Sequence, residues 1–214
     1  TGEGLRRSGR RDRVEKKLRR RGIPSGNLID CLIPTVDAWI RDYGPSFVLR
    51  SLAGRREKAF VRWTFNAWGG KYESLARDNE VAGRLAPFLG LPVFSPGLVL
   101  EGGSIDTNGE GTVLVTEQCL LNPNRNSPLS RKGIEEALKN FLGLTHCIWL
   151  GEGIEGDDTD GHIDDITRFV SPTTVVTAVE TNPADSNEAP LRDNLKRLQQ
   201  AVDPQGRKLE IVTM

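Results

Sequence analysis

The chain has 214 residues, 37% of them hydrophobic and 27% charged, and its 29 basic side chains balance 29 acidic ones. This composition indicates a globular protein that can bury a sizeable core. No apolar run approaches the ~20 residues of a membrane span, and no apolar stretch follows the basic start, which argues against a membrane-spanning or secreted protein. Three cysteines without CxxC spacing argue against a disulfide framework, so we expect a cytoplasmic protein.

Positive charge is concentrated at the start of the chain. Residues 1–21 carry 10 of the basic and 3 of the acidic side chains, which leaves the remainder acidic. Val14 and Leu18 are spaced as one narrow apolar stripe, so we predict a solvated basic helix over residues 1–21 and a single domain over residues 22–214. We expect no nucleic-acid or membrane partner, and the acidic body suits a cationic substrate.

Apolar periodicity and turn signals predict alternating strands and helices. Strands are predicted at residues 28–33, 47–50, 58–64, 92–94, 98–101, 146–150, 163–170, 174–179 and 208–212, helices at 72–89, 130–142 and 191–202, and a hairpin at 104–115 around Asn108-Gly109. Helix-strand units interleaved with hairpins indicate an α/β protein of repeated modules.

Residues 157–165, with the sequence DDTDGHIDD, place five carboxylates around one of only two histidines. Carboxylates this close repel one another unless water, a metal or a cationic ligand screens them. If Gly161 begins a strand, His162 and Asp164 lie two residues apart and project from the same face. A base beside an acceptor is a catalytic arrangement.

Other interpretations of this segment were weighed against that one. A calcium loop of the helix-loop-helix kind needs a glutamate at its twelfth place, where this sequence has Thr167. A zinc site needs more ligands, and the other histidine, His146, lies in an apolar segment that is typical of a buried strand. A solvated acidic loop with a hydrogen-bonded His162 stays open as the alternative.

Five motifs, in this order, resemble those of the agmatine deiminases and the related Porphyromonas-type bacterial peptidyl-arginine deiminases, which are guanidine-modifying enzymes. They are WIRDYGP (39–45), FNAWGGK (65–71), EGGSID (101–106), CLLNPNRN (119–126) and DTDGHID (158–164). The resemblance runs from about residue 31 to the C-terminus. It implies an α/β fold, the five-fold α/β-propeller (pentein) of ββαβ modules around a central active site, of which this chain would form a part.

The resemblance also implies an activity, the hydrolysis of a guanidine C–N bond. The favoured reaction is agmatine and water to N-carbamoylputrescine and ammonia, in putrescine biosynthesis. The alternatives are a peptidyl-arginine deiminase, an inactive guanidinium-binding module and a metal-dependent amidohydrolase. We expect no cofactor and no metal, a small guanidine cation as the partner, and an oligomeric state that the sequence leaves open.

By the same resemblance, four residues are expected to be catalytic. Asp42 and Asp164 would clamp the guanidinium, since its parallel N–H pairs match the two oxygens of a carboxylate. His162 would act as general acid and base, and its carboxylate neighbours would favour its charged form. Glu101 would orient His162 from behind.

Further residues are candidates for binding the substrate. Trp39 and Trp68 could wall the pocket, with a cation–π contribution of about 0.5–2 kcal/mol, although core packing is an equal alternative for Trp68. The acidic run that includes Asp158 and Asp160 could receive the distal ammonium of agmatine.

The nucleophile of the family is missing. In the family a cysteine thiolate forms a covalent thiouronium intermediate, and it lies near the C-terminus in a Gly-rich His-Cys motif that this chain lacks. Cys31, Cys119 and Cys147 all lie in other surroundings. We therefore expect the chain to be a fragment with the middle modules of a deiminase, inactive by itself.

Overall fold

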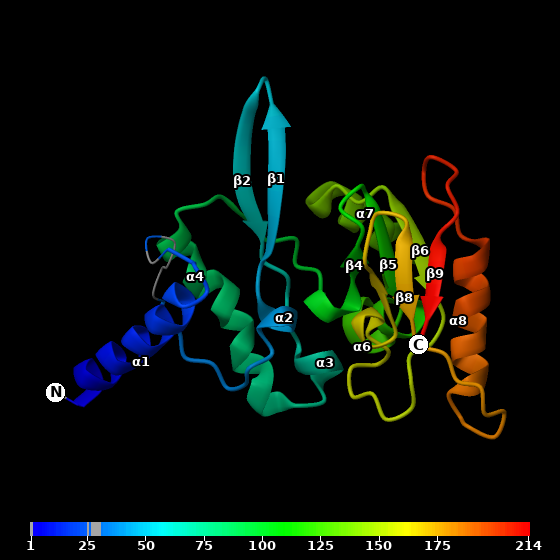
Figure 1. Ribbon diagram of the computed structural model, residues 1–214, viewed down its shortest axis with the longest axis horizontal. Coiled ribbons are helices and arrows are strands. Elements are labelled where there is room, and N and C mark those ends of the chain that lie inside the picture. The colour runs from blue at the N-terminus through cyan, green and yellow to red at the C-terminus, as the bar shows by residue number, and fades with distance from the viewer. Residues whose placement is uncertain (1, 25, 27–30) are drawn as a thin grey trace.

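The computed structural model describes residues 2–24, 26 and 31–214, and its core is three small mixed sheets (Figure 1). In each sheet two strands form an antiparallel pair, and a third strand joins the second in parallel. A helix precedes that third strand each time, because a parallel connection needs a crossover. The chain therefore repeats a ββαβ module.

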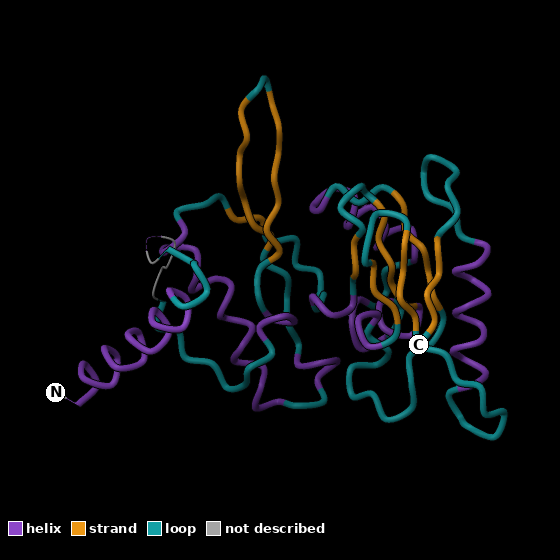
Figure 2. The backbone as a smooth tube through the Cα atoms, viewed as in Figure 1, coloured by secondary structure: helices purple, strands orange, loops and turns teal. Residues whose placement is uncertain are grey.

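The modules follow one another along the chain. They are β1 (Ser46–Leu52), β2 (Arg55–Val61), α4 (Val81–Leu89) and β3 (Val93–Phe94); then β4 (Asp106–Thr107), β5 (Thr112–Thr116), α7 (Arg131–Leu142) and β6 (His146–Leu150); then β7 (Thr167–Phe169), β8 (Thr174–Thr177), α8 (Glu188–Gln200) and β9 (Glu210–Thr213). The second and third modules lie side by side, with α8 on the outer flank, while the β1–β2 hairpin projects from the body (Figures 1 and 2).

A short helical turn comes before the first strand of every module. These entry turns are α2 (Ile40–Tyr43), η3 (Gly102–Ser104) and η4 (Ile163–Asp165). The turn η3 contacts both of the others. The remaining helical segments are α1 (Gly2–Arg19), α3 (Ala67–Gly70), η2 (Glu73–Glu80), α5 (Glu117–Leu120) and α6 (Pro123–Asn126).

The second module shows how the sequence determines the local structure. The Ser130 hydroxyl accepts a hydrogen bond from the Gly133 N–H and caps α7, and Gly143, at a φ of +72°, ends it. Helix α7 presents Ile134 and Leu138 to a core that β5 shares. Every residue of β5 is buried, because the strand has a partner on each edge and a packed layer on each face.

Several predicted elements are confirmed and others need correction. The Asn108-Gly109 hairpin and the capped helix α7 form as predicted. The helix predicted at residues 72–89 divides at Glu80 into η2 and α4. The segment predicted as a strand at residues 98–101 makes only a single bridge, from Val99 to Thr64.

The strand predicted at residues 163–170 was wrong at its start. Residues Ile163–Asp165 form the turn η4, and the strand β7 begins only at Thr167. The strand predicted at residues 28–33 lies mostly outside the described residues, and residues 31–33 belong to no strand. Within the described part of the chain, no helix is both long enough and apolar enough to cross a bilayer.

Candidate active site

Most of the predicted site residues meet at one cavity of about 590 Å³. Its lining includes Trp39, Asp42, Trp68, Asp158, His162 and Asp164. These residues are spread over more than a hundred positions of the sequence, and the contacts among the three entry turns bring them together. A solvated acidic loop would not gather them in this way.

Asp42 lies on α2 and is held by two hydrogen bonds. Its Oδ1 accepts from the Gly103 N–H at 2.9 Å, and its Oδ2 accepts from Trp68 Nε1 at 3.0 Å. Trp68 reaches this position through left-handed backbone, with φ values of +57° at Ala67 and +54° at Trp68. Non-glycine residues seldom adopt this conformation, and clusters of it are typical of functional sites. Trp68 therefore packs in the core and also orients Asp42.

Gly103, in the turn η3, allows the acidic groups to approach the histidine. His162 Nδ1 lies 3.9 Å from Asp42 Oδ1 and 3.8 Å from Asp164 Oδ1. A Cβ atom at Gly103 would lie 2.4 Å from His162 Nδ1 and 2.8 Å and 2.9 Å from the two carboxylate oxygens. His162 and Asp164 thus share one cavity as expected, but from the turn η4 rather than from one face of a strand.

The loop that carries His162 binds the carboxylate of Asp157 with its own backbone. Both oxygens of Asp157 accept backbone N–H groups, from Thr159 on one side and from Gly161 and His162 on the other. Backbone donors thus satisfy this part of the acidic run, where the sequence suggested water, a metal or a cationic ligand.

Burial controls the protonation of His162. Desolvation lowers its pKa to about 4 and outweighs the attraction of Asp42 and Asp157. The neighbouring carboxylates do favour the charged ring, as expected, but the sequence could not show that desolvation outweighs them. In the part of the chain that is described, His162 Nε2 is buried without a hydrogen-bond partner.

Asp164 lies between two arginines. Arg168 Nη1 is 3.5 Å and Arg41 Nε is 3.7 Å from Asp164 Oδ2. Burial nevertheless raises the pKa of Asp164 to about 6, with Asp165 and Asp42 adding to the effect, and the two arginines oppose it. A cation bound in the cavity would favour the charged carboxylate and so lower this pKa.

This raised pKa predicts that removing the charge of Asp164 stabilises the fold. Because the folded pKa exceeds the ordinary value near 4, ionised Asp164 costs stability above about pH 6, and this cost disappears as the pH falls below about 4. We expect Asp164→Asn to raise the free energy of unfolding at pH 7.5 by about 1 kcal/mol, which corresponds to a Tm that is higher by about 2–4 °C, and to leave Tm unchanged near pH 4. Differential scanning calorimetry at the two pH values measures this, with the exposed Glu136→Gln as the control. A lower Tm for Asp164→Asn at pH 7.5 would contradict it.

Glu101 lies behind the histidine and does not line the cavity. Its side chain is fully buried, and its Oε1 is 2.8 Å from Arg125 Nε. Burial raises the pKa of Glu101 to about 7, and Arg125 opposes that rise. A carboxylate oxygen of Glu101 lies within 4.8 Å of a His162 ring nitrogen and of Cys119 Sγ. Glu101 can therefore act on His162 from behind, as the resemblance implies.

Glu101, Cys119 and His162 are also close enough together to hold a metal ion. Two features oppose cation binding here. Arg125 already neutralises Glu101, and burial raises the pKa of the Cys119 thiol well above its usual range. The sequence had given no sign that Cys119 approaches the histidine. We assign these three residues no metal.

The two acidic residues predicted to receive an ammonium group have different surroundings. Asp158 is exposed at the cavity, and its Oδ2 accepts a hydrogen bond from Tyr72 at 2.7 Å. Asp160 is not in the cavity lining, and its carboxylate binds Lys71, Asn124 and Arg125. Asp160 therefore has cationic partners within the chain, while Asp158 keeps one oxygen facing outward. Trp39 is largely exposed at the cavity rim.

The three cysteines do not line this cavity. Cys119 is buried behind His162, and Cys147 lies on β6, where burial raises its thiol pKa to about 11. Cys31 precedes α2 and is partly exposed. A thiolate nucleophile would have to face the open side of the cavity, and these thiols do not.

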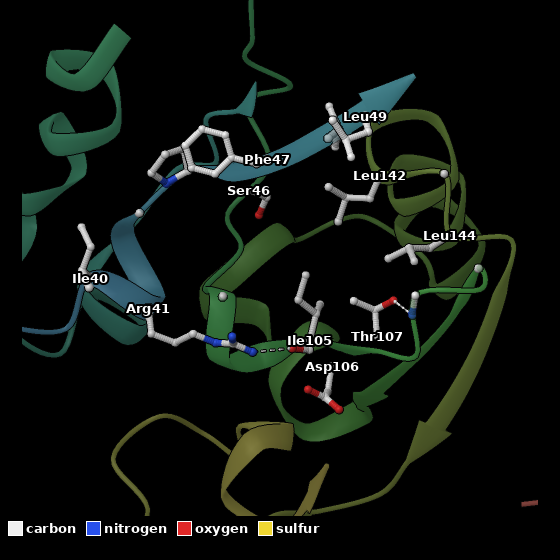
Figure 3. A pocket seen from close by; sticks show the side chains of 17 residues that line it. Ile40, Arg41, Ser46, Phe47, Leu49, Ile105, Asp106, Thr107, Leu142 and Leu144 are labelled. Carbon is white, nitrogen blue, oxygen red and sulfur yellow. Dashed lines mark hydrogen bonds between the residues drawn. The ribbon is translucent and has the colours of Figure 1, made fainter. Parts of the chain in front are cut away.

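A second cavity, of about 820 Å³, also has Arg41 in its lining (Figure 3). Apolar side chains from β1 and the end of α7 line it, among them Phe47, Leu49 and Leu142. Arg41 contributes to both cavities and donates a hydrogen bond to the Ile105 carbonyl. None of the predicted site residues lines this second cavity.

Comparison with known proteins places the chain in one family. The model of the Porphyromonas-type peptidyl-arginine deiminases matches residues 7–214, and the chain belongs to this family. The agmatine deiminase of Ectopseudomonas mendocina is 43% identical over 187 residues, which are 85% of this chain and 50% of that protein. The chain spans about half the length of the curated relatives it matches.

Solved structures agree with this placement. The agmatine deiminase of Enterococcus faecalis superimposes with a TM-score of 0.78 at 34% identity, over 91% of this chain and 54% of that one. The agmatine deiminase of C. jejuni gives a TM-score of 0.66 at 34% identity, over 84% of this chain and 50% of that one.

Proposed function

We propose that this chain forms part of a guanidine hydrolase, with agmatine as the substrate. The observation that carries the proposal is the convergence of Asp42 and Asp164 beside Gly103, both within 4 Å of the buried His162. A planar guanidinium can donate to both carboxylates at once. Each such charge-assisted hydrogen bond contributes on the order of 1.5–3 kcal/mol.

The geometry suggests an order of proton transfers. His162 starts neutral because burial lowers its pKa, so it can accept the proton of an incoming thiol. The thiolate then attacks the guanidinium carbon and forms a C–S bond. The protonated histidine passes its proton to the nitrogen that leaves as ammonia when the C–N bond breaks. The neutral ring next takes a proton from the attacking water, and it returns that proton to the sulfur as the C–S bond breaks and the neutral urea product forms. Asp42 and Asp164 hold the two cations of this sequence, the guanidinium and the thiouronium.

The proposal requires a thiolate from outside these 214 residues, since Cys31, Cys119 and Cys147 do not line the cavity.

We also propose that the three ββαβ modules form part of a five-fold propeller. Support comes from the repetition of the module and from the entry turns, which deliver Asp42, Gly103 and His162 from equivalent places in three modules. Further modules would continue the same ring.

Agmatine is favoured over peptidyl-arginine by the exposed Asp158. Agmatine ends in an ammonium group, while an arginine within a peptide presents neutral amides at that distance from the guanidinium. Asp158 is fixed by Tyr72 and by the Lys71 ammonium, which donates to the Asp158 carbonyl. Its free carboxylate oxygen supplies the negative charge that an ammonium group needs.

Two measurements on the 214-residue chain, agmatine binding and ammonia release, test different parts of this proposal. We expect the 214-residue chain to bind agmatine in a calorimetric titration but to release no ammonia from it. Asp42→Asn should weaken binding about tenfold or more, for the loss of one charge-assisted contact. Asp158→Asn should weaken agmatine binding while leaving benzoyl-arginine amide unaffected.

Three results would count against the proposal. Ammonia release by the chain that disappears in Cys31→Ala or Cys147→Ala would show that the nucleophile lies within it. Absence of agmatine binding would show that Asp42 and Asp164 do not clamp a guanidinium. Equal effects of Asp158→Asn on the binding of agmatine and of benzoyl-arginine amide would show that Asp158 does not recognise the ammonium group of agmatine. A longer protein that contains this chain and a cysteine facing the cavity should convert agmatine to N-carbamoylputrescine and ammonia.

A further inference from the structure

The side chain of Arg125 lies in the interior of the site, on the short helix α6. It is fully buried, as is the carboxylate of Glu101 with which it pairs. A buried guanidinium is costly unless it is paired, so its partners indicate what it does. Among the described residues, Arg125 Nε and the Glu101 carboxylate form an ion pair without hydrogen-bond geometry, whereas both terminal nitrogens of Arg125 donate hydrogen bonds. Neither the composition nor the charge pattern of the sequence had drawn attention to this arginine.

Arg125 makes contacts in two directions. Its Nε lies 2.8 Å from Glu101 Oε1, behind His162. Its Nη1 donates to Asp160 Oδ2 at 2.9 Å, and its Nη2 donates to the Thr159 carbonyl at 2.9 Å. The second pair of contacts lies on the loop that leads directly into His162. One planar group thus joins the carboxylate behind the histidine to the loop that carries the histidine.

The chain is built to leave room for this guanidinium. Gly69 has a φ of +84°, and a Cβ atom there would lie 2.5 Å from Arg125 Nη1 and 2.2 Å from Asn124 Nδ2. Asn124 Oδ1 accepts a hydrogen bond from Arg125 Nη1 at 2.8 Å, and the Asn124 carbonyl accepts one from Asn66. Two motifs of the sequence, at residues 65–71 and 119–126, therefore cooperate to place one side chain.

We propose that Arg125 is a positioning residue, which holds Glu101 against His162 by tying it to residues 159–160 of the histidine loop. This inference rests on the proposed function, because it concerns the same histidine. Arg125 favours the anionic form of Glu101 against the effect of burial and fixes the separation of Glu101 and His162, without touching the substrate. A lysine could not replace it, since a single ammonium cannot match carboxylates on two sides as a planar fork does.

The first experiment is a double-mutant cycle on kcat in a longer protein that contains this chain and turns over agmatine. We expect Arg125→Met and Arg125→Lys each to lower kcat about tenfold or more with little change in KM. In a Glu101→Gln background, Arg125→Met should lower kcat by less than about twofold, since groups in one network couple by factors of about 2 to 150. Additive losses, or a fully active Arg125→Lys, would overturn the proposal.

The second experiment uses the 214-residue chain and needs no turnover. The chain has two histidines, His146 and His162, so labelled histidine gives two sets of ring ¹⁵N signals that show which nitrogen carries the proton. Arg125→Met should alter the His162 signals, and the Glu101→Gln/Arg125→Met double variant should match Glu101→Gln alone. The double variant also removes both buried charges, which avoids leaving Glu101 unpaired.

Arg197→Met is the matched control for both experiments. Arg197 also bridges two carboxylates, Glu117 and Asp193, and donates to the Trp149 carbonyl, but it lies away from His162. Its loss should lower stability and leave the His162 signals and kcat unchanged. If Arg125→Met likewise lowers only Tm, Arg125 is structural. If the longer protein is inactive on agmatine while the His162 signals still depend on Arg125 through Glu101, the proposed function fails and the positioning role stands.

Discussion

His162→Ala should lower kcat of a catalytically complete protein by about 10²–10⁴-fold, the usual contribution of a positioned acid–base group. His162 lies within 4 Å of the carboxylates of Asp42 and Asp164 and within 4.8 Å of Glu101, and the other histidine of the chain does not line the cavity. Ammonia release from agmatine under saturating conditions measures the effect. KM should change little, because the two aspartates bind the guanidinium.

The second histidine supplies the matched control. His146 begins β6, is partly exposed and does not line the cavity. His146→Ala should leave kcat within about twofold of the unsubstituted protein, since surface substitutions away from special features change stability by about 0.5 kcal/mol or less. If the His162→Ala protein had near-normal turnover, His162 would be a hydrogen-bonded residue of a solvated loop and not a catalytic group.

Gly103→Ala should be nearly as damaging as removal of the histidine, although it adds a single methyl group. The added Cβ would lie less than 3 Å from His162 Nδ1, Asp42 Oδ1 and Asp164 Oδ1, so all three groups must move. A displacement of about 1 Å at a reacting centre can cost on the order of 10²-fold in rate. We expect a loss of this size or more in kcat/KM, with binding of agmatine weakened as well. Steady-state kinetics and calorimetric titration measure the two effects.

Gly133→Ala is the corresponding control for the added methyl group. Gly133 lies in the first turn of α7, where a Cβ would make only ordinary contacts with Leu129. Because alanine favours a helix over glycine by about 1 kcal/mol, this variant should keep full activity and gain stability. If Gly103→Ala retains the activity of Gly133→Ala, the close packing around Gly103 has no catalytic importance.

The repeated module could be predicted because its signals are local. The Ser130 cap, the Asn108-Gly109 turn and the apolar positions of α7 act within a few residues of one another. The strand start at Thr167 was missed for a physical reason. Ile163 and Ile166 suggested a strand, but they lie three positions apart, a spacing that places both on one side of a 3₁₀ turn and on opposite faces of a strand.

The site was predicted as a set of residues and not as a network. The motifs indicated Asp42, His162 and Asp164, which the structure brings together. The roles of Gly103 and Arg125 depend on contacts between segments 24 or more positions apart, which no local pattern encodes. The low pKa of His162 could not be predicted from the sequence either, because it depends on how completely the ring is buried.

The three entry turns also determine when the site can exist during folding. Each module has a local hairpin and a crossover helix that can form early, but the cavity needs turns about 60 residues apart in the chain to dock on one another. Closing loops of that length is entropically costly and slow compared with forming a helix. During synthesis Asp42 leaves the ribosome first and His162 about 120 residues later. The site is therefore complete only after the third turn has emerged, and partial opening of one module removes it while the other modules stay folded.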